Sequence, residues 1–139
     1  MAALTACSGG DSIEAARDGG SLACAALVAR LPASVLGRDR RDLDVAGAAR
    51  WGDPAIVLRC GVPPTGPTSD YCIDADDVQW TFRDLGKRYR FTTYGRTPAV
   101  EVVVPSSVGR TNATSALIDL TAAVRPLPVG ARCVGPDDA

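Results

Sequence analysis

The chain has 139 residues, of which 46% are apolar, and its formal net charge is −1. This length and apolar content predict one domain with a buried core, and the near-neutral charge gives no general attraction for nucleic acid or for an anionic membrane surface. Histidine is absent, which excludes Ser-His-Asp and Cys-His catalysis within this chain and removes the commonest zinc ligand.

The chain begins with an apolar run that ends at a cysteine. Leu4-Thr5-Ala6-Cys7 resembles a bacterial lipobox, in which small residues precede the cysteine that receives a diacylglyceryl group. The segment SGGDSIEAARDGGS that follows is typical of a flexible tether. The residues before Cys7 lack the basic start and the apolar stretch of about 7–15 residues of a secretory signal, so either the N-terminus is truncated or the match is a coincidence. We expect residues 1–20 to be a signal-peptide remnant with a lipobox and a flexible tether that packs on nothing, and Cys7 to be the lipidation site.

The chain has five cysteines, which are Cys7, Cys24, Cys60, Cys72 and Cys133. No pair has C-x-x-C spacing, which argues against thioredoxin-like and zinc-ribbon sites. An even set of four with one left over indicates two disulfides and an oxidising compartment. Four cysteines allow three pairings. We expect Cys60–Cys72, which would close a turn-rich loop, and Cys24–Cys133, which would tie the first helix to the C-terminal tail.

The first predicted element after the tether is a helix over residues 21–31, with Ser21 as its N-cap and Pro32 just past its end. The charged stretch GRDRRDLD is expected to be a connector, and VAGAARWGDP a short helical turn. Residues 55–60, with the sequence AIVLRC, predict a strand because they are rich in β-branched and apolar residues.

The second half of the chain predicts a hairpin-linked sheet and a closing helix. DVQWTFRDL alternates apolar and polar residues, LGKR is a hairpin turn, and YRFTTYG and PAVEVVVP follow as antiparallel strands. Residues 111–124 predict a helix. We therefore expect an α+β fold for residues 21–139, with an antiparallel sheet of three to four strands, the N- and C-terminal helices packed on one face, and two disulfides.

Two blocks of this sequence carry a resemblance to a known family. WGDPAIVLRCGVP over residues 51–63 and TTYGRTPAVEVVVP over residues 92–105, together with Cys72 and Trp80, resemble the actinobacterial domain of unknown function 3515 family. The similarity covers roughly residues 22–135. It implies a secreted or membrane-anchored protein and implies no particular activity.

The same two blocks contain the candidate ligand-binding residues, which are Trp51, Asp53, Arg59, Tyr94, Arg96 and Glu101. Trp51 could be an exposed stacking platform beside an Asp53–Arg59 binding pair, or a core residue beside a turn and a surface cation. Tyr94, Arg96 and Glu101 could line a groove for an anionic or sugar-like ligand. Alternatively, Glu101 forms a cross-strand salt bridge with Arg96, Arg59 or Arg83.

Two charged runs have simple interpretations. DADD at residues 74–77 lacks the spacing of an EF-hand loop, and we expect no metal site. RDRR at residues 38–41 could contact lipid phosphates beside a membrane, but neighbouring aspartates neutralise it and favour a plain surface run. All basic residues except Lys87 are arginines, which we attribute to coding bias rather than to a phosphate-binding surface.

These features predict a lipid-anchored binding or accessory module of the cell envelope, located outside the cytoplasm on the outer face of the cytoplasmic membrane. Its partners would be the membrane, through a lipid on Cys7, and an unknown envelope protein or small ligand; we expect no nucleic acid and no cofactor. No catalytic residue is assigned. The alternative is a small envelope enzyme with Asp/Glu/Arg chemistry, for which Glu101, Asp53 and Arg96 are the residues to test.

Overall fold

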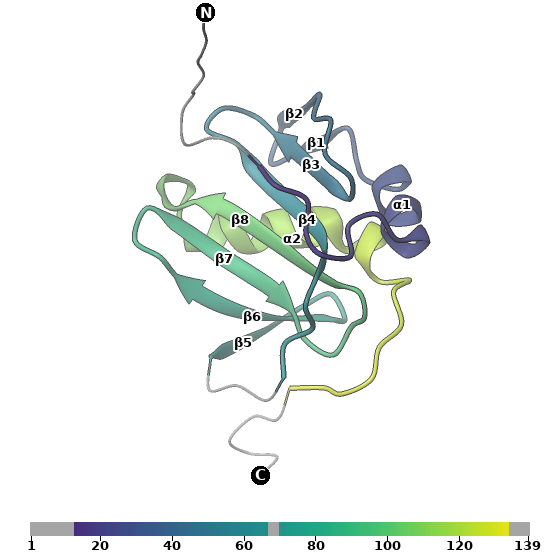
Figure 1. The fold of residues 1–139 in the computed structure, drawn as a ribbon. Coiled ribbons are helices and arrows are strands. Elements are labelled where there is room, and N and C mark those ends of the chain that lie inside the picture. The colour runs from purple at the N-terminus through teal and green to yellow at the C-terminus, as the bar shows by residue number, and fades with distance from the viewer. Residues whose placement is uncertain (1–12, 67–69, 134–139) are drawn as a thin grey trace, which may run out of the picture.

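The computed structural model describes residues 13–66 and 70–133. Within these residues the chain forms one antiparallel sheet of eight strands in the order β1-β2-β3-β4-β8-β7-β6-β5 (Figure 1). The strands are β1 (Ser34–Val35), β2 (Arg38–Arg41), β3 (Ala48–Trp51), β4 (Ile56–Val62), β5 (Tyr71–Ala75), β6 (Val78–Asp84), β7 (Arg88–Thr93) and β8 (Ala99–Pro105). Two four-stranded meanders, β1–β4 and β5–β8, are thus joined by the pairing of β4 with β8. The expected α+β fold with a sheet of three to four strands is wrong, because the described residues form a single antiparallel sheet with eight strands.

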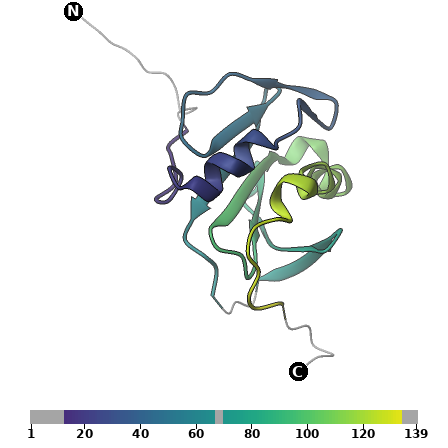
Figure 2. The ribbon, with the colours of Figure 1, turned by 90° about the vertical axis from the view of Figure 1, so that its right-hand side faces the viewer.

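Two α-helices, α1 (Leu22–Ala29) and α2 (Arg110–Val124), and a short 3-10 helix, η1 (Ser106–Val108), accompany the sheet in the described residues. The side chain of Ser21 caps α1 by accepting a hydrogen bond of 3.2 Å from the backbone N–H of Cys24. Figure 2 shows both α-helices on the same side of the sheet. The other face of the sheet therefore carries no helix among the described residues.

The core lies between the sheet and the helices. Its largest fully buried side chains include Trp51, Trp80 and Phe91 from the sheet and Leu117 and Leu120 from α2. Because side chains alternate along a strand, the central strands send every second residue into this core and the residues between them to the open face. The register makes residues that are paired across strands share a face.

The strands missing from the sequence prediction are β1, β2, β3 and β5. RDRR forms β2 rather than a connector, and AARW forms β3 rather than a helical turn. Strand β2 has no buried residue, so it lacks the apolar alternation from which a strand is recognised. Backbone pairing with β3 holds it in place, with Arg40 opposite Trp51 and Arg41 opposite Arg50.

The described residues contain two disulfides, but the expected pairings are wrong. Cys24 is bonded to Cys60, with Cα atoms 5.5 Å apart, and Cys72 to Cys133, with Cα atoms 6.5 Å apart. Cys60 alternates with Arg59 and points to the helix side of β4, where α1 brings Cys24. Cys72 is the cross-strand partner of Thr81, whose side chain lies on the open face of the sheet, opposite the helices. Cys60 and Cys72 therefore point to different sides of the sheet, which excludes the expected bridge between them.

Residues 13–20 lie along β4, contrary to the expectation that the first twenty residues pack on nothing. The backbone N–H of Asp18 donates a hydrogen bond of 3.0 Å to the carbonyl of Gly61, and Gly19 is buried. Gly61 has a φ of +102°, and a Cβ atom there would collide with the backbone of Asp18. The predicted lipobox with Cys7 lies outside the described residues. Within the described residues, no helix has the length and apolar character needed to cross a membrane.

Candidate functional site

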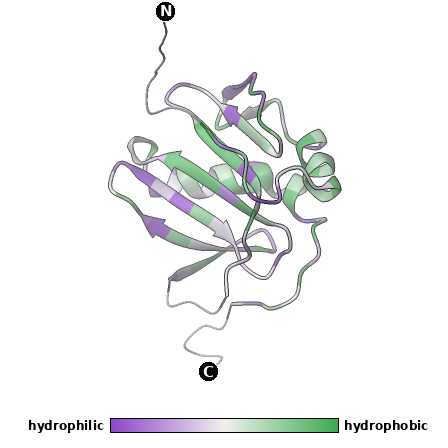
Figure 3. Ribbon diagram, in the orientation of Figure 1, coloured by the Kyte–Doolittle hydropathy of each residue, from purple (hydrophilic) through white to green (hydrophobic). Residues whose placement is uncertain are grey.

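The two faces of the sheet differ in what covers them. The helix side is the buried core, whereas the open side carries polar and charged residues from six consecutive strands, β2 to β6 in the order of the sheet. Figure 3 shows that the two central strands, β4 and β8, are mostly hydrophobic, whereas the flanking strand β7 is more hydrophilic. The hydrophilic position in β4 is Arg59 and that in β8 is Glu101.

Arg59 and Glu101 are direct cross-strand partners at the centre of the open face. The Nη2 and Nε atoms of Arg59 lie 2.9 Å and 3.0 Å from Oε1 of Glu101, so the two side chains form a hydrogen-bonded ion pair. Arg59 also donates from Nη1 to the backbone carbonyl of Glu14, at 3.4 Å. The ion pair is the cross-strand salt bridge considered from the sequence, and it joins β4, β8 and the N-terminal segment.

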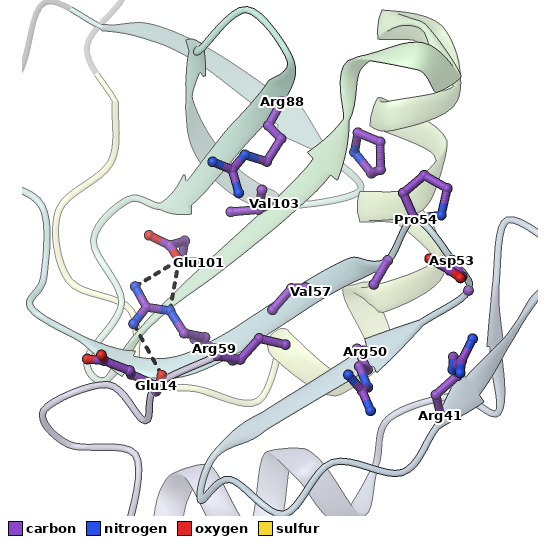
Figure 4. Close-up of a pocket in the computed structure, with 14 residues that line it drawn as sticks. Glu14, Arg41, Arg50, Asp53, Pro54, Val57, Arg59, Arg88, Glu101 and Val103 are labelled. Carbon is purple, nitrogen blue, oxygen red and sulfur yellow. Dashed lines mark hydrogen bonds and ion pairs between the residues drawn. The ribbon is translucent and has the colours of Figure 1, made fainter. Parts of the chain in front are cut away.

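A groove with a volume of about 770 Å³ lies beside this ion pair on the open face (Figure 4). Val57 of β4 and Val103 of β8 form its floor, and they are direct cross-strand partners. Arg41 and Arg50 stand on one side of this floor, and Arg88 stands on the other (Figure 4). The groove therefore combines an apolar floor with cationic sides.

The three carboxylates that line the groove lie at its two ends. Glu14 and Glu101 are next to Arg59 at one end, and Asp53 lies beside Pro54 at the other (Figure 4). Glu101 is neutralised by Arg59. Asp53 forms no ion pair with a described residue, and it is exposed.

Arg41 and Arg50 are an unusual feature, because they are like-charged residues directly opposite each other on neighbouring strands. Such a pair is destabilising unless an anion separates the charges. Neither arginine forms an ion pair within the described part of the chain. Arg50 donates from Nη2 to the backbone carbonyl of Asp42 at 2.9 Å, while its Nε is buried and has no acceptor among the described residues.

A second, smaller hollow of about 220 Å³ lies on the other side of Glu101. Thr81, Thr92 and Arg90 line it, together with the ion pair between Arg83 and Asp70 at 2.8 Å. Arg83 and Arg90 are also direct cross-strand partners, but here Asp70 supplies a negative charge. Glu101 lines both hollows, so they adjoin at this residue.

The structure brings Asp53, Arg59 and Glu101 together in the groove and places the other three predicted ligand-binding residues elsewhere. Trp51 is fully buried and donates from Nε1 to the carbonyl of Pro32 at 3.1 Å. It is therefore a core residue and not an exposed stacking platform. Tyr94 is half-buried beyond the end of β7 and lines neither hollow.

Arg96 is buried away from the groove and does not meet Glu101. Its Nη1 donates to the backbone carbonyls of Arg125 at 2.8 Å and Leu127 at 2.7 Å, just after α2. Burial lowers the pKa of the Arg96 guanidinium, and the positive charges of Arg132 and Arg125 lower it further. The expected groove of Tyr94, Arg96 and Glu101 is therefore not formed, and Arg96 instead fastens the segment that follows α2.

Two aspartates of the acidic run at residues 74–77, which spans the end of β5 and the turn after it, pair with arginines near the C-terminus. Asp76 pairs with Arg125 at 3.1 Å, and Asp74 pairs with Arg132 at 3.8 Å. In the described residues, no group of three or more Cys, Asp or Glu side chains is placed to hold a metal ion.

Sequence reasoning did not consider Arg50 or Arg88, and it interpreted Arg41, within RDRR, as part of a plain surface run rather than a contact for lipid phosphates. The sequence pattern could have located Arg50 and Arg88. Arg50 lies between the buried residues Ala49 and Trp51, and Arg88 is the first residue of a strand in which Tyr89 and Phe91 are buried. Once these segments are recognised as strands, alternation assigns both arginines to the open face. Arg41 has no such signal, because all of β2 is charged.

Comparison with known proteins gives one match. The family model described as a protein of unknown function (DUF3515) matches residues 9–130. No curated protein and no solved structure matches the chain.

Proposed function

The chain belongs to the DUF3515 family of proteins of unknown function, and we propose that it is a lipid-anchored, extracytoplasmic binding module of the cell envelope. The open sheet face is its binding surface, and Cys7 is its point of attachment to the outer face of the cytoplasmic membrane. The observation that carries the binding role is the grooved, charged face of a sheet whose other face is sealed by α1 and α2.

The disulfides support a location outside the cytoplasm. Both Cys24–Cys60 and Cys72–Cys133 are formed within one fold, and structural disulfides persist in oxidising compartments. All four cysteines of the domain are used in these bonds, which leaves Cys7 as the cysteine available for another role. The sequence LTAC at residues 4–7 supports lipid attachment as that role.

The groove supports binding better than catalysis. Of the carboxylates considered for an envelope enzyme, Glu101 is engaged by Arg59, and Asp53 lies at the opposite end of the groove (Figure 4). Arg96 is not part of the groove. These residues therefore do not converge on one point where a substrate could react, whereas the flanking arginines can hold a ligand.

Lipid attachment is tested by expressing the full chain behind a lipoprotein signal segment and measuring the mass of the N-terminal peptide. We expect a diacylglyceryl adduct on Cys7 and recovery of the protein with membranes. Cys7→Ser should abolish the adduct and release the protein. Recovery of both proteins with membranes, or an unmodified Cys7, would contradict lipid attachment.

The binding role is tested by photo-crosslinking in intact envelopes. A photoreactive residue replaces Ala55, which lines the groove, or Ile118, which is 51% exposed on α2. We expect specific adducts from position 55 and not from position 118. Equal labelling from both positions, or no adduct from position 55, would argue against the open face as a binding surface.

A further inference from the structure

We infer that the groove binds a phosphate group, held between Arg41 and Arg50 with Arg88 facing it from the opposite side. This inference rests on the proposed binding role of the open face and specifies the ligand chemistry.

The first support is the pairing of two like charges. Arg41 and Arg50 occupy opposed positions of β2 and β3 on the open face, where Cβ atoms of cross-strand partners are about 5 Å apart. The cost of this arrangement is removed when an anion lies between the guanidinium groups. In the second hollow the equivalent pair, Arg83 and Arg90, already has the carboxylate of Asp70 beside it. The Arg41–Arg50 pair has no such carboxylate bonded to it within the described residues.

The second support is the fixed position of the Arg50 guanidinium. Its Nε is buried and unpartnered in the described part of the chain, although buried polar atoms are nearly always hydrogen-bonded. Its Nη2 is already fixed by the carbonyl of Asp42. Because Nε is closed to solvent, an anion in the groove would meet the Nη atoms of a guanidinium that is already held in place.

The number of acceptors favours phosphate over a carboxylate. One arginine satisfies one carboxylate, as Arg59 does for Glu101 in the same groove. Two adjacent guanidinium groups carry two positive charges and more N–H donors than one carboxylate can satisfy. A phosphate monoester supplies nearly two negative charges and three terminal oxygens. The apolar floor of Val57 and Val103 lowers the local dielectric beside such contacts.

The phosphate could belong to a lipid headgroup or to a soluble ester. Ile13 lines the groove, and the six residues from Cys7 to Ile13 can span at most about 20 Å. A lipid on Cys7 would therefore hold the groove near the membrane surface, where both kinds of phosphate are within reach.

The first experiment titrates the full, unlipidated chain with glycerol 3-phosphate by calorimetry. We expect binding that weakens as salt is raised, with acetate giving no binding at the same concentrations. Arg41→Gln and Arg50→Gln should each weaken binding by about tenfold or more, since each removes charge-assisted hydrogen bonds. Arg88→Gln should weaken it by a smaller factor.

Arg40→Gln is the matched control, because Arg40 is exposed on the same strand but belongs to the other face. It makes the same change in charge and should leave binding unchanged. Arg41 is also exposed, so Arg41→Gln keeps the test valid even if Arg50→Gln fails to fold. Equal loss in the Arg40→Gln and Arg41→Gln variants would overturn the site, because the effect would then be one of net charge.

The second experiment identifies the source of the phosphate with vesicles. Arg41-dependent binding to vesicles that contain phosphatidic acid, whose headgroup is a phosphate monoester, and not to vesicles that contain the phosphodiester phosphatidylglycerol, assigns a lipid headgroup. Arg41-dependent binding of glycerol 3-phosphate without vesicle binding assigns a soluble ester. Binding to neither overturns the inference. If the protein binds neither phosphate source but still forms crosslinks from position 55, the open face is a binding surface for a different ligand. If crosslinks from position 55 are also absent, the phosphate inference and the proposed binding role both fail.

Discussion

Arg59 and Glu101 face each other across the pairing of β4 with β8, and their ion pair joins the two meanders of the sheet at the centre of its open face. The side chains are 29% and 15% exposed, so water screens the pair less than it would at an open surface. The pair has two consequences: it neutralises one of the carboxylates that line the groove, and it holds the N-terminal segment through the contact of Arg59 with the carbonyl of Glu14.

Glu101→Gln is expected to lower the free energy of unfolding by about 1–2 kcal/mol, between the values for exposed and buried ion pairs. The reason is that Arg59 keeps its position but loses its counter-charge. Urea denaturation measures the change. Arg17→Gln is the control, since Arg17 and Asp18 form an exposed pair at 3.7 Å. A loss for Glu101→Gln no larger than that of the control would show that the central pair is not stabilising.

Arg96→Met is expected to destabilise the fold by about 2–4 kcal/mol, because the carbonyls of Arg125 and Leu127 lose their donor. Hydrogen exchange should accelerate first in the residues that follow α2. Arg125→Gln removes an exposed arginine from the same region and should cost less than about 1 kcal/mol. If Arg96→Met instead left stability unchanged and abolished ligand binding, Arg96 would be a binding residue.

The disulfides are expected to be reduced in a fixed order. Cys24 and Cys60 are fully buried, whereas Cys72 and Cys133 are half-buried, and a reductant must reach a sulfur atom to attack it. Brief treatment with dithiothreitol followed by alkylation should label Cys72 and Cys133 first, as peptide masses will show. Earlier labelling of Cys24 or Cys60 would contradict the burial.

Loss of either disulfide should be costly. The bonds join residues 36 and 61 positions apart, and loops of these sizes correspond to about 4 kcal/mol each in the chain-entropy model. Replacing Cys72 and Cys133 together by serine should therefore lower the melting temperature strongly. A melting temperature equal to that of the wild-type protein would show that this bond does not stabilise the fold.

Gly61→Ala is expected to displace residues 13–20 from β4. Gly61 has a positive φ, and an added Cβ would meet the backbone of Asp18 and Gly19. Limited proteolysis should then cleave at Arg17 faster than in the wild-type protein. Gly86→Ala is the control, since Gly86 also has a positive φ but open space around it; it should cost only the conformational strain of about 1–2 kcal/mol. Equal proteolysis of the two variants would exclude the packing of this segment as the cause.

The elements with strong local signals were predictable. The first helix has a capping serine and a proline beyond its end, and β4, β6, β7 and β8 contain apolar residues with the spacing of strands. Strand β2 could not be recognised, because its four residues are all charged and only backbone pairing with β1 and β3 makes them a strand. Of the residues that line the groove, Asp53, Arg59 and Glu101 were candidates from the sequence, Arg41 was interpreted as part of a plain surface run, and Arg50 and Arg88 were not considered.

The sequence alone determined that the chain folds around an apolar core, that its cysteines indicate an oxidising compartment, and that the blocks around Arg59 and Glu101 resemble one family. These conclusions depend on the composition, the number of cysteines and the local periodicity of apolar residues, which are properties of the sequence itself. The tertiary structure decided which cysteines pair, that Trp51 and Arg96 are buried, and that Arg41 meets Arg50 across two strands. Such contacts depend on sheet register and on which face a residue occupies, and a shift of one residue in pairing reverses the face; no local pattern in the sequence fixes that register.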